Sequence, residues 1–258
     1  EIDGRRLKVS NLQKVLYPET GFTKAEVIDY AVRVAPTMLP HIADRGLTLR
    51  RYPNGVDGQS FFEKRCPSHR PDWVGTFAGP GDRNGTIGYC ALDSVAALAW
   101  AANLAALELH APMARGVDID APTMCVFDLD PGVPAGMRQC AEVALDIRDT
   151  LEGLAGLQCF AKTSGSKGMQ LYVPLNTPHT HEHCSSFALA VAQVLEKHHE
   201  DRVTSVMARA VRPGKVFIDW SQNSRHKTTV AVYSLRARPR PTVSTPVTWD
   251  EVSDAASG

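Results

Sequence analysis

The sequence predicts an α+β fold, and its length allows one large domain or two intimate lobes. Apolar runs typical of strands, such as residues 125–127 and 216–218, occur beside amphipathic stretches typical of helices, such as 187–195. With 258 residues, 43% of them hydrophobic and 22% charged, the chain is long enough to bury a substantial core and has a globular composition.

Composition argues against a membrane or secreted protein. No apolar segment approaches the length of a bilayer span, and no signal-peptide core is present. The chain begins at Glu1 without Met and ends in small residues, so we expect it to be trimmed at both ends. The six cysteines form no C-x-x-C pair, which predicts a cytoplasmic protein with reduced, buried thiols and no disulfide.

Charge is balanced overall but segregated along the chain. The net charge of zero argues against a uniformly basic nucleic-acid binder. Residues 202–240 hold nine Lys or Arg and one acidic residue, whereas residues 93–153 hold ten acidic and three basic residues. The two segments could form an acidic, metal-binding floor and a basic, phosphate-binding wall; two solvated faces would explain them equally well.

Two lysines flank the first predicted helix. Residues 23–26 form a capping box that opens a helix running toward Met38, with two prolines disturbing its end. Lys24 occupies the first helical position, so Lys14 and Lys24 could grip one phosphate. Exposed lysines are more often simply surface residues.

A strand at residues 47–52 carries Arg50 and Arg51. Phe61 and Phe62 follow in a second extended segment, where adjacent side chains face opposite ways. We therefore expect one ring in the core and the other to be a stacking platform for a base. Further on, the glycine-rich residues 75–88 are expected to form a flexible loop, and an alanine-rich helix from residue 93 to 109 is expected to end at His110.

The sequence TMCVFDLDP at residues 123–131 predicts a strand that ends in two carboxylates. In a strand, Asp128 and Asp130 point to the same face, where they repel each other unless a divalent cation or a base lies between them. Such oxygen ligands suit magnesium or manganese and a phosphate-bearing substrate. For an isolated D-x-D, a pair of strand-end aspartates turning into a loop is the more common explanation.

A glycine-rich turn follows a predicted helix at residues 137–154. The turn, residues 164–168, joins two strands rather than a strand and a helix, so a Walker-type site is disfavoured. Its backbone N–H groups, the hydroxyls of Ser164 and Ser166, and the Lys167 ammonium still suit a triphosphate.

A run of three histidines at residues 179–183 resembles a zinc cluster. Its alternating spacing does not bring three ligands to one helix face, so we expect a polar turn that leads into the helix at 187–195. The strand at 216–219 ends in Asp219, whose burial demands a partner; a metal shared with Asp128 and Asp130 would supply one. After a strand at 228–235, Arg236, Arg238 and Arg240 alternate on the exit, and the chain ends in a frayed tail.

The motifs VFDLDP, TSGSKG and VFIDWSQN, in this order, resemble the polymerase domain of bacterial ligase D, in the archaeo-eukaryotic primase superfamily, and its stand-alone Prim-Pol type relatives in actinobacteria. LQKVLYP, TKAEV, RRYPNG, FFEK, AALELH and KTTVAVYSLRAR extend the resemblance over nearly the whole chain. The resemblance implies one primase-polymerase catalytic domain over residues 1–258, with an RRM-like catalytic sheet and a second α/β lobe across a cleft.

The resemblance also implies the chemistry and its residues. It implies that Asp128, Asp130 and Asp219 bind two Mn²⁺ or Mg²⁺ ions for nucleotidyl transfer. The residues implied to bind the nucleoside triphosphate are His110, Ser164, Ser166, Lys167, Gln170, Lys227 and Arg236. Those implied to bind DNA are Lys14 and Lys24 on a 5′-phosphate, Phe61 and Phe62 on the template, and Arg50, Arg51 and Arg238.

The implied function is template-directed filling of gaps and broken ends in DNA, with ribonucleotides preferred and de novo priming left open. Ligase and end-binding repair proteins would act in trans, in the cytoplasm at the nucleoid. A non-catalytic module that binds DNA ends is the alternative; a two-metal phosphoesterase is disfavoured by the triphosphate-type turn.

One position departs from the family pattern. The family's second motif usually ends in histidine, whereas this chain has Gln170. Glutamine donates a hydrogen bond but cannot carry charge, so we expect weaker triphosphate binding or altered nucleotide preference, with the chemistry retained.

Overall fold

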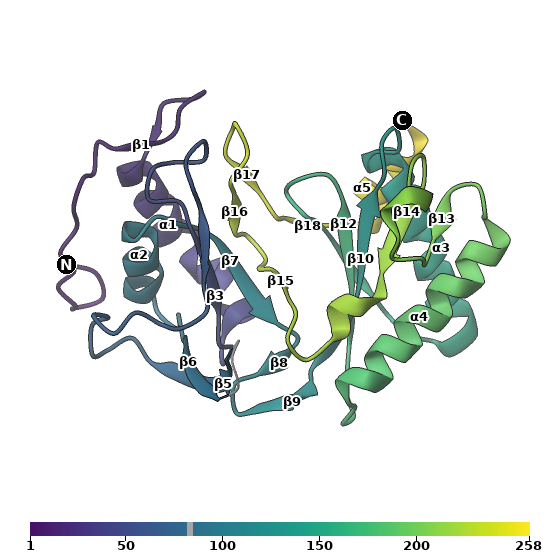
Figure 1. The fold of residues 1–258 in the computed structure, drawn as a ribbon, viewed down its shortest axis with the longest axis horizontal. Helices are drawn as coiled ribbons and strands as arrows, with labels where there is room; N and C mark the ends of the chain where they lie inside the picture. The colour runs from purple at the N-terminus through teal and green to yellow at the C-terminus, as the bar shows by residue number, and fades with distance from the viewer. Residues whose placement is uncertain (82–84) are drawn as a thin grey trace. The chain divides into compact units, whose positions relative to one another are not determined.

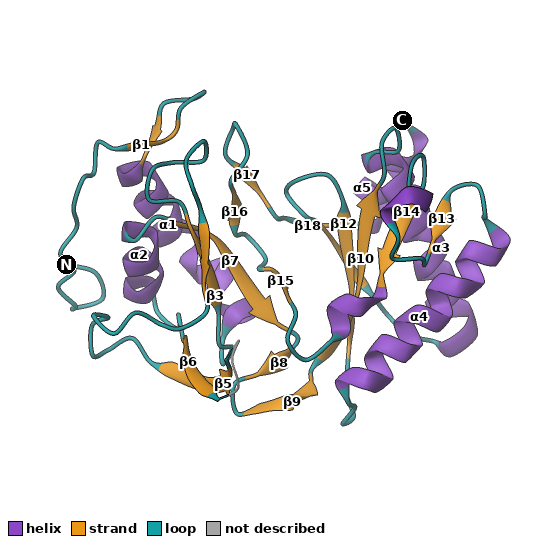
Figure 2. Ribbon diagram, in the orientation of Figure 1, coloured by secondary structure: helices purple, strands orange, loops and turns teal. Residues whose placement is uncertain are grey.

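The computed structural model describes residues 1–81 and 85–258, which divide into two compact units (Figure 1). Unit 1 comprises Glu1–Ile119 and Thr228–Ser244, and unit 2 comprises Asp120–Lys227 and Thr245–Gly258. Helices and strands are interspersed in both units, as Figure 2 shows, so the predicted α+β class is confirmed.

Unit 1 is built on a four-stranded antiparallel sheet. Its strand order is β15 (Thr228–Val230), β7 (Ala106–Pro112), β3 (Thr48–Arg51) and β4 (Phe61–Glu63). The helices are α1 (Lys24–Ile42) and α2 (Val95–Asn103), and they pack on each other and on the sheet through buried residues such as Met38, Leu98 and Leu109. The remaining strands are β1 (Val15–Tyr17), β2 (Phe22–Thr23), β5 (Thr76–Pro80), β6 (Thr86–Cys90), β8 (Ala114–Arg115), β16 (Leu235–Arg236) and β17 (Thr242–Val243); β9 (Asp118–Pro122) lies at the boundary with unit 2.

Unit 2 is built on a six-stranded sheet that is antiparallel except for its first pair. Its strand order is β13 (Val203–Thr204), β14 (Val216–Asp219), β10 (Met124–Pro131), β12 (Met169–Pro174), β11 (Phe160–Thr163) and β18 (Pro246–Val247). The helical segments are α3 (Met137–Ala155), α4 (His181–His198), α5 (Trp249–Ser257), η1 (Arg209–Val211) and η2 (Trp220–Asn223). Cys125, Phe127 and Leu129 belong to the core that the helices cover, which leaves Asp128 and Asp130 on the opposite face of β10.

Several predicted boundaries in unit 1 are wrong. The alanine-rich helix ends at Asn103, and Ala105 has a φ of 57°, after which AALELH continues as strand β7; His110 therefore lies on a strand and not at a helix end. Residues 75–88 are largely the β5–β6 hairpin rather than a loop, and residues 82–84 of that segment lie outside the described residues. The segment 228–235 is not one strand either, because a turn at Tyr233, with a φ of 64°, separates β15 from β16.

Three helices are longer than the patterns predict. Helix α1 has the predicted capping box at Thr23 but continues through both prolines to Ile42, which is buried together with Met38. Helix α4 already begins at His181, capped by Thr180, and the C-terminal tail is helix α5 rather than frayed. In each case buried apolar residues hold turns that local sequence signals would end.

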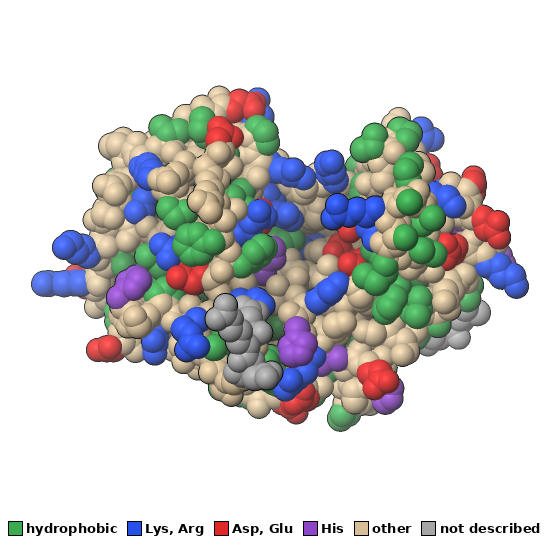
Figure 3. Space-filling model, in the orientation of Figure 1, with side chains coloured by type: hydrophobic (Ala, Val, Ile, Leu, Met, Phe, Trp, Pro, Cys, Tyr) green, Lys and Arg blue, Asp and Glu red, His purple; other side chains and the backbone are tan. Residues whose placement is uncertain are grey.

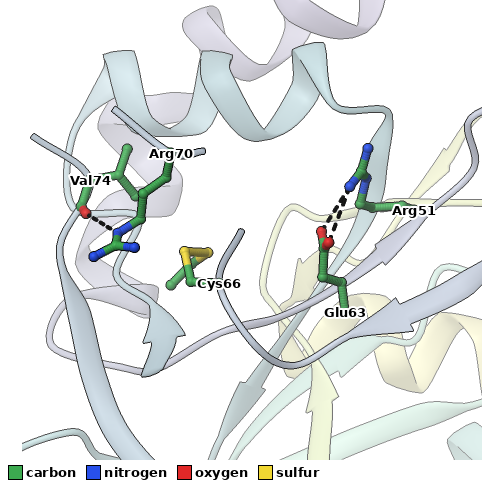
Figure 4. The surroundings of a disulfide bond; sticks show 6 residues. Arg51, Glu63, Cys66, Arg70 and Val74 are labelled. Carbon is green, nitrogen blue, oxygen red and sulfur yellow. Dashed lines mark hydrogen bonds and ion pairs between the residues drawn. A yellow bond between two sulfur atoms is a disulfide. The ribbon is translucent and has the colours of Figure 1, made fainter. Parts of the chain in front are cut away.

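The expectation that no disulfide forms is also wrong. Cys66 and Cys90 are joined, with their Cα atoms 4.8 Å apart, which ties the segment after β4 to the end of β6. Figure 4 shows this bond between two stabilising contacts, the ion pair of Arg51 with Glu63 and the bond that Arg70 donates to the carbonyl of Val74. The other four cysteines are buried free thiols, as predicted.

Candidate active site

In unit 2, four polar residues form a row across neighbouring strands. Lys162 on β11 lies opposite Gln170 on β12, Gln170 lies opposite Asp128 on β10, and Asp128 lies opposite Asp219 on β14. Directly opposed residues share one face of a sheet. The strand register therefore gathers these four side chains, hereafter the polar row, with Asp130 two residues further along β10.

Hydrogen bonds fix the orientation of the row. The Nε2 of Gln170 donates to Oδ1 of Asp128 at 3.1 Å, and the hydroxyl of Tyr172 donates to Oε1 of Gln170 at 3.0 Å. A carboxylate only accepts, so the amide must present its NH₂ group to Asp128 and its oxygen to Tyr172. The ammonium of Lys162, only 2% exposed, lies 5.6 Å from the centre of the Tyr172 ring.

Asp219 is held by the residues that follow it. Its Oδ1 accepts bonds from the backbone N–H and the hydroxyl of Ser221, and its Oδ2 accepts one from Gln222 at 3.2 Å. The Nζ of Lys227 lies 3.7 Å from Oδ2 and also donates to the hydroxyl of Ser221. Lys227, which the resemblance implies to bind the triphosphate, thus lies beside the carboxylate of Asp219.

The carboxylates of this site are electrostatically opposed to one another. Burial raises the pKa of Asp128 to about 7, and the charges of Asp130 and Asp219 add to the rise against the bond from Gln170. Burial and Asp219 likewise raise the pKa of Asp130. A divalent cation would relieve this repulsion, and carboxylate oxygens are the donors that Mg²⁺ and Mn²⁺ prefer.

The donor chemistry thus fits a divalent metal, whereas a preformed cage is not present. Within residues 1–81 and 85–258, no group of three or more His, Cys, Asp and Glu side chains is placed to hold a metal ion. The hydrogen bonds that Asp219 accepts account for part of this, because they direct both of its oxygens toward η2 and Lys227. The histidine run forms no zinc site either: His181 is buried and its Nδ1 lies 2.8 Å from the carbonyl of Asn223.

The predicted triphosphate turn lies between β11 and β12. The hydroxyl of Ser164 accepts bonds from the N–H groups of Ser166 and Gly168, both at 3.2 Å, and Lys167 is exposed. A Cβ at Gly168 would come within 1.9 Å of the carbonyl oxygen of Leu129, so only glycine fits there. This close approach fixes the turn beside the strand that carries Asp128 and Asp130.

In unit 1, a second charged group surrounds Glu108, which is 2% exposed. Its Oε1 accepts bonds from Arg236 Nε at 3.0 Å and from the N–H of Ala237 at 3.1 Å. Its Oε2 lies 3.3 Å from both Arg50 Nη1 and His110 Nε2. We call Glu108, Arg50, His110 and Arg236 the Glu108 cluster.

The Glu108 cluster is electrostatically complementary. Burial alone would raise the pKa of Glu108, but the hydrogen bond with His110, the charge of Arg236 and the N–H of Ala237 outweigh it and lower the pKa to about 2. The sequence pattern did not single out Glu108, Lys162 or Tyr172. A strand period in AALELH would have indicated Glu108, because it places this residue beside the charged ends of neighbouring strands.

The two phenylalanines lie on the edge strand β4, and neither is in the core. Phe61 is 44% exposed and Phe62 is 56% exposed, so the expectation of one buried ring is wrong. Each ring instead lies against a guanidinium, Phe61 against Arg51 at 5.3 Å and Phe62 against Arg50 at 5.1 Å. Strand β4 is the edge strand of its sheet, and both rings lie exposed there against guanidinium groups.

The two N-terminal lysines lie close together. The N–H of Lys24 donates to the carbonyl of Lys14 at 2.8 Å, and Lys24 is only 6% exposed. Burial and the charges of Lys14 and Arg51 lower the pKa of Lys24. The side chains donate to Asn54 at 2.9 Å and to Ser10 at 3.5 Å.

The three alternating arginines do not act together. Arg236 belongs to the Glu108 cluster, Arg240 lies 3.9 Å from Glu19, and Arg238 is half-buried after β16. On the face drawn in Figure 3, Lys and Arg side chains are visible beside acidic and hydrophobic ones.

Comparisons with known proteins identify the family of the chain. Residues 23–258 match the family described as LigD, primase-polymerase domain. The chain is 47% identical over 260 residues to the multifunctional non-homologous end joining DNA repair protein LigD of Mycobacterium tuberculosis H37Rv, covering 98% of this chain and 34% of that protein. It is 29% identical over 251 residues to the bifunctional LigD of Bacillus subtilis, covering 97% and 40%.

A solved structure gives the same result. The polymerase domain from M. tuberculosis ligase D in complex with DNA matches with a TM-score of 0.91 at 46% identity, over 97% of this chain and 90% of that one. The chain spans about a third of the length of the M. tuberculosis relative. Within the described residues, none of the helices combines the length and apolar character that crossing a membrane requires. The chain has the archaeo-eukaryotic primase fold and belongs to the LigD primase-polymerase domain family.

Proposed function

We propose that this chain is a metal-dependent, template-directed nucleotidyltransferase that fills short gaps and extends broken DNA ends during end joining, with ribonucleotides preferred. The observation that carries the proposal is the polar row. It places mutually repelling carboxylates on one sheet face, directly beside a Ser-Gly-Ser-Lys turn whose donors suit a triphosphate. The family to which the chain belongs supports the same chemistry.

In unit 2, Asp128, Asp130 and Asp219 would hold Mn²⁺ or Mg²⁺. Bound there, the ions would lower the pKa of an attacking hydroxyl and neutralise charge on the triphosphate. The turn would bind triphosphate oxygens through its backbone N–H groups and Ser164, Ser166 and Lys167, while Lys227 would balance charge beside Asp219. Gln170 is 4% exposed and donates to Asp128, so its first effect would be on the orientation of that carboxylate.

In unit 1, the exposed and cationic groups would bind nucleic acid and phosphate. Lys14 and Lys24 would hold a 5′-phosphate, a role that the lowered pKa of buried Lys24 supports. Phe61 and Phe62 would stack on template bases. The neighbouring Arg50 and Arg51, together with Arg238, would contact the sugar-phosphate backbone of the DNA. His110 and Arg236 would contact nucleotide phosphates.

A module that binds DNA ends without catalysis is the alternative. One observation favours it: glutamine replaces the family histidine. It would use Lys14 and Lys24 in the same way but would not extend a primer.

Primer extension separates the two functions. The substrate is a short gapped duplex with a 5′-phosphate, supplied with Mn²⁺ and either rNTPs or dNTPs. We expect templated extension by the wild type, favouring rNTPs, and none by Asp128→Ala. Asp201→Ala, a change at an exposed carboxylate of unit 2, is the matched control and should extend normally. Tight DNA binding without extension would support the alternative, and release of phosphate rather than pyrophosphate would indicate a phosphoesterase.

A further inference from the structure

We propose that Glu108 is a positioning residue that couples the template-stacking ring of Phe62 to the phosphate-binding groups His110 and Arg236. The proposal rests on the proposed function of these residues and adds a role for a carboxylate that touches neither substrate. At 2% exposure, Glu108 is sealed from solvent and acts only through its neighbours.

The two oxygens of Glu108 divide its partners into two sets. Oε1 binds the side of β16, through Arg236 Nε at 3.0 Å and the N–H of Ala237 at 3.1 Å. Oε2 binds the side of β3 and β7, through Arg50 and His110, both at 3.3 Å. A rotation of the carboxylate therefore moves both sets together, because the two oxygens belong to one rigid group.

The link continues outward through Arg50. Its guanidinium lies 5.1 Å from the ring of Phe62 and 5.2 Å from the ring of Tyr52, and Nη2 donates to Ser60 at 3.4 Å. Among the described atoms, Arg50 Nε is buried and has no hydrogen-bond partner, so Glu108 and Ser60 supply the hydrogen bonds that orient the group. The ring of Phe62 also meets His110 edge-on, with centroids 5.5 Å apart.

These contacts make the position of Phe62 and that of the phosphate-binding groups interdependent. A base that stacks on Phe62 favours one position of the ring and of the Arg50 guanidinium behind it. Arg50 shares Oε2 with His110, and Arg236 uses the other oxygen, so ordering at one end reduces the freedom at the other. Without the charge of Glu108, Arg50 and Arg236 would lose their common partner and the link with it.

A double-mutant cycle tests the coupling. The apparent KM for GTP opposite a template dC is measured by gap filling in the wild type, Phe62→Ala, Glu108→Gln and the double variant. Glutamine keeps the shape and one acceptor of Glu108 but removes its charge. Glu196→Gln is the control for stability, since Glu196 in unit 2 also accepts bonds, from Thr204 and Ser205, and its pKa is also lowered.

We expect Phe62→Ala to raise the GTP KM about tenfold in the wild-type background and to leave it nearly unchanged in Glu108→Gln, a coupling of ordinary size between two sites. The control should match the loss of thermal stability without changing KM. An equal effect of Phe62→Ala in both backgrounds would overturn the proposal, as would a GTP KM that Glu108→Gln leaves at the wild-type value.

Two further measurements keep the test decisive. If Glu108→Gln does not fold, a cycle of Phe62→Ala with Arg236→Lys probes the two ends of the same link with Glu108 in place, and additive effects would refute it. Fluorescence anisotropy with the 5′-phosphorylated gapped duplex needs no catalysis. A wild type that binds but never extends would overturn the proposed function alone, whereas unchanged duplex affinity of Glu108→Gln would overturn the coupling.

Discussion

Glu108, buried in unit 1, and Asp128, half-buried in unit 2, are both strand carboxylates, yet their surroundings have opposite effects on their pKa values. Two arginines, a histidine and a backbone N–H face Glu108, and its pKa is lowered to about 2. Burial and two further carboxylates dominate around Asp128, and its pKa is raised to about 7. The charge of Glu108 is balanced within the protein, whereas Asp128 lies among like charges that a divalent cation would balance.

The comparison distinguishes a charge that stabilises the fold from a charge that is available to a ligand. A carboxylate matched by its neighbours stabilises the fold and has little to offer a ligand. A carboxylate held beside others of its kind costs stability, and the metal that relieves the cost is bound more tightly for that reason. Substitutions at these two carboxylates and at Gln170, together with the addition of manganese, test this contrast.

Removing the charge of Glu108 should have the largest effect. Glu108→Gln leaves Arg50 and Arg236 without a carboxylate, so we expect the free energy of unfolding to fall by about 3 kcal/mol. Urea denaturation followed by circular dichroism at pH 7.5 measures it. Glu63→Gln, at a more exposed carboxylate that pairs with Arg51, should cost less than about 1 kcal/mol; equal losses in the two variants would refute the contrast.

Removing the charge of Asp128 should raise the free energy of unfolding rather than lower it. The folded-state pKa lies above the unfolded value of 3.8, so folding binds a proton and stability declines as pH rises from about 4 to 7. In metal-free protein at pH 8, Asp128→Asn should therefore raise the free energy of unfolding by about 2 kcal/mol. Below pH 3.8 the gain should vanish. A loss of stability at pH 8, measured by the same urea titration, would contradict the raised pKa.

The stabilisation that Glu108 provides should depend on pH in the acidic range. Its folded-state pKa lies below the unfolded value of 4.5, so its contribution is complete above that pH and is lost as pH falls toward 2. The free energies of unfolding of wild type and Glu108→Gln should therefore approach each other only as pH falls from 4.5 toward 2.

Manganese should stabilise the DNA-free protein by binding to Asp128 and Asp130. At a tenfold excess over its Kd, an ion that binds only the folded state adds about 1.4 kcal/mol. We expect a rise in Tm with MnCl₂ for the wild type and none for the double variant Asp128→Asn, Asp130→Asn. Equal rises in both would place the binding elsewhere.

The smallest change concerns Gln170. Histidine could donate to Asp128 through one ring nitrogen and accept from Tyr172 through the other, and unlike glutamine it can carry charge. Gln170→His should lower the nucleotide KM by roughly threefold, the gain expected of a charge-assisted contact. Steady-state gap filling measures it, and an unchanged or higher KM would show that Gln170 does not limit nucleotide binding.

Local sequence signals were enough to predict the acidic strand of unit 2 and the strands beside it. The run ending in DLDP, the strand–turn–strand at the glycines and the strand before Asp219 each carry their own period and stop signals. Sequence could not give the register that opposes Asp219 to Asp128 and Gln170 to Lys162, because it depends on pairing between strands far apart in the chain.

Unit 1 was predicted less well because tertiary contacts override its local signals. Alanine-rich sequence favours helix, yet β7 needs the residues after Asn103 as the centre of a sheet. The spacing of the cysteines predicts reduced thiols, but Cys66 donates its N–H to the carbonyl of Gly88 at 2.7 Å, and this contact brings it beside Cys90. The stacking of both phenylalanines on arginines likewise depends on which strand lies at the edge.

Because Gly168 packs against the carbonyl of Leu129, the length of the turn at residues 164–168 affects the candidate active site. The turn 164–168 sets the register of β12, and β12 in turn aligns Gln170 with Asp128. One residue inserted in this turn would shift the partner of Asp128 by a position and present the opposite face of the strand. Insertions that surface loops ordinarily tolerate should therefore be absent from this one among working relatives, even where its residue types vary.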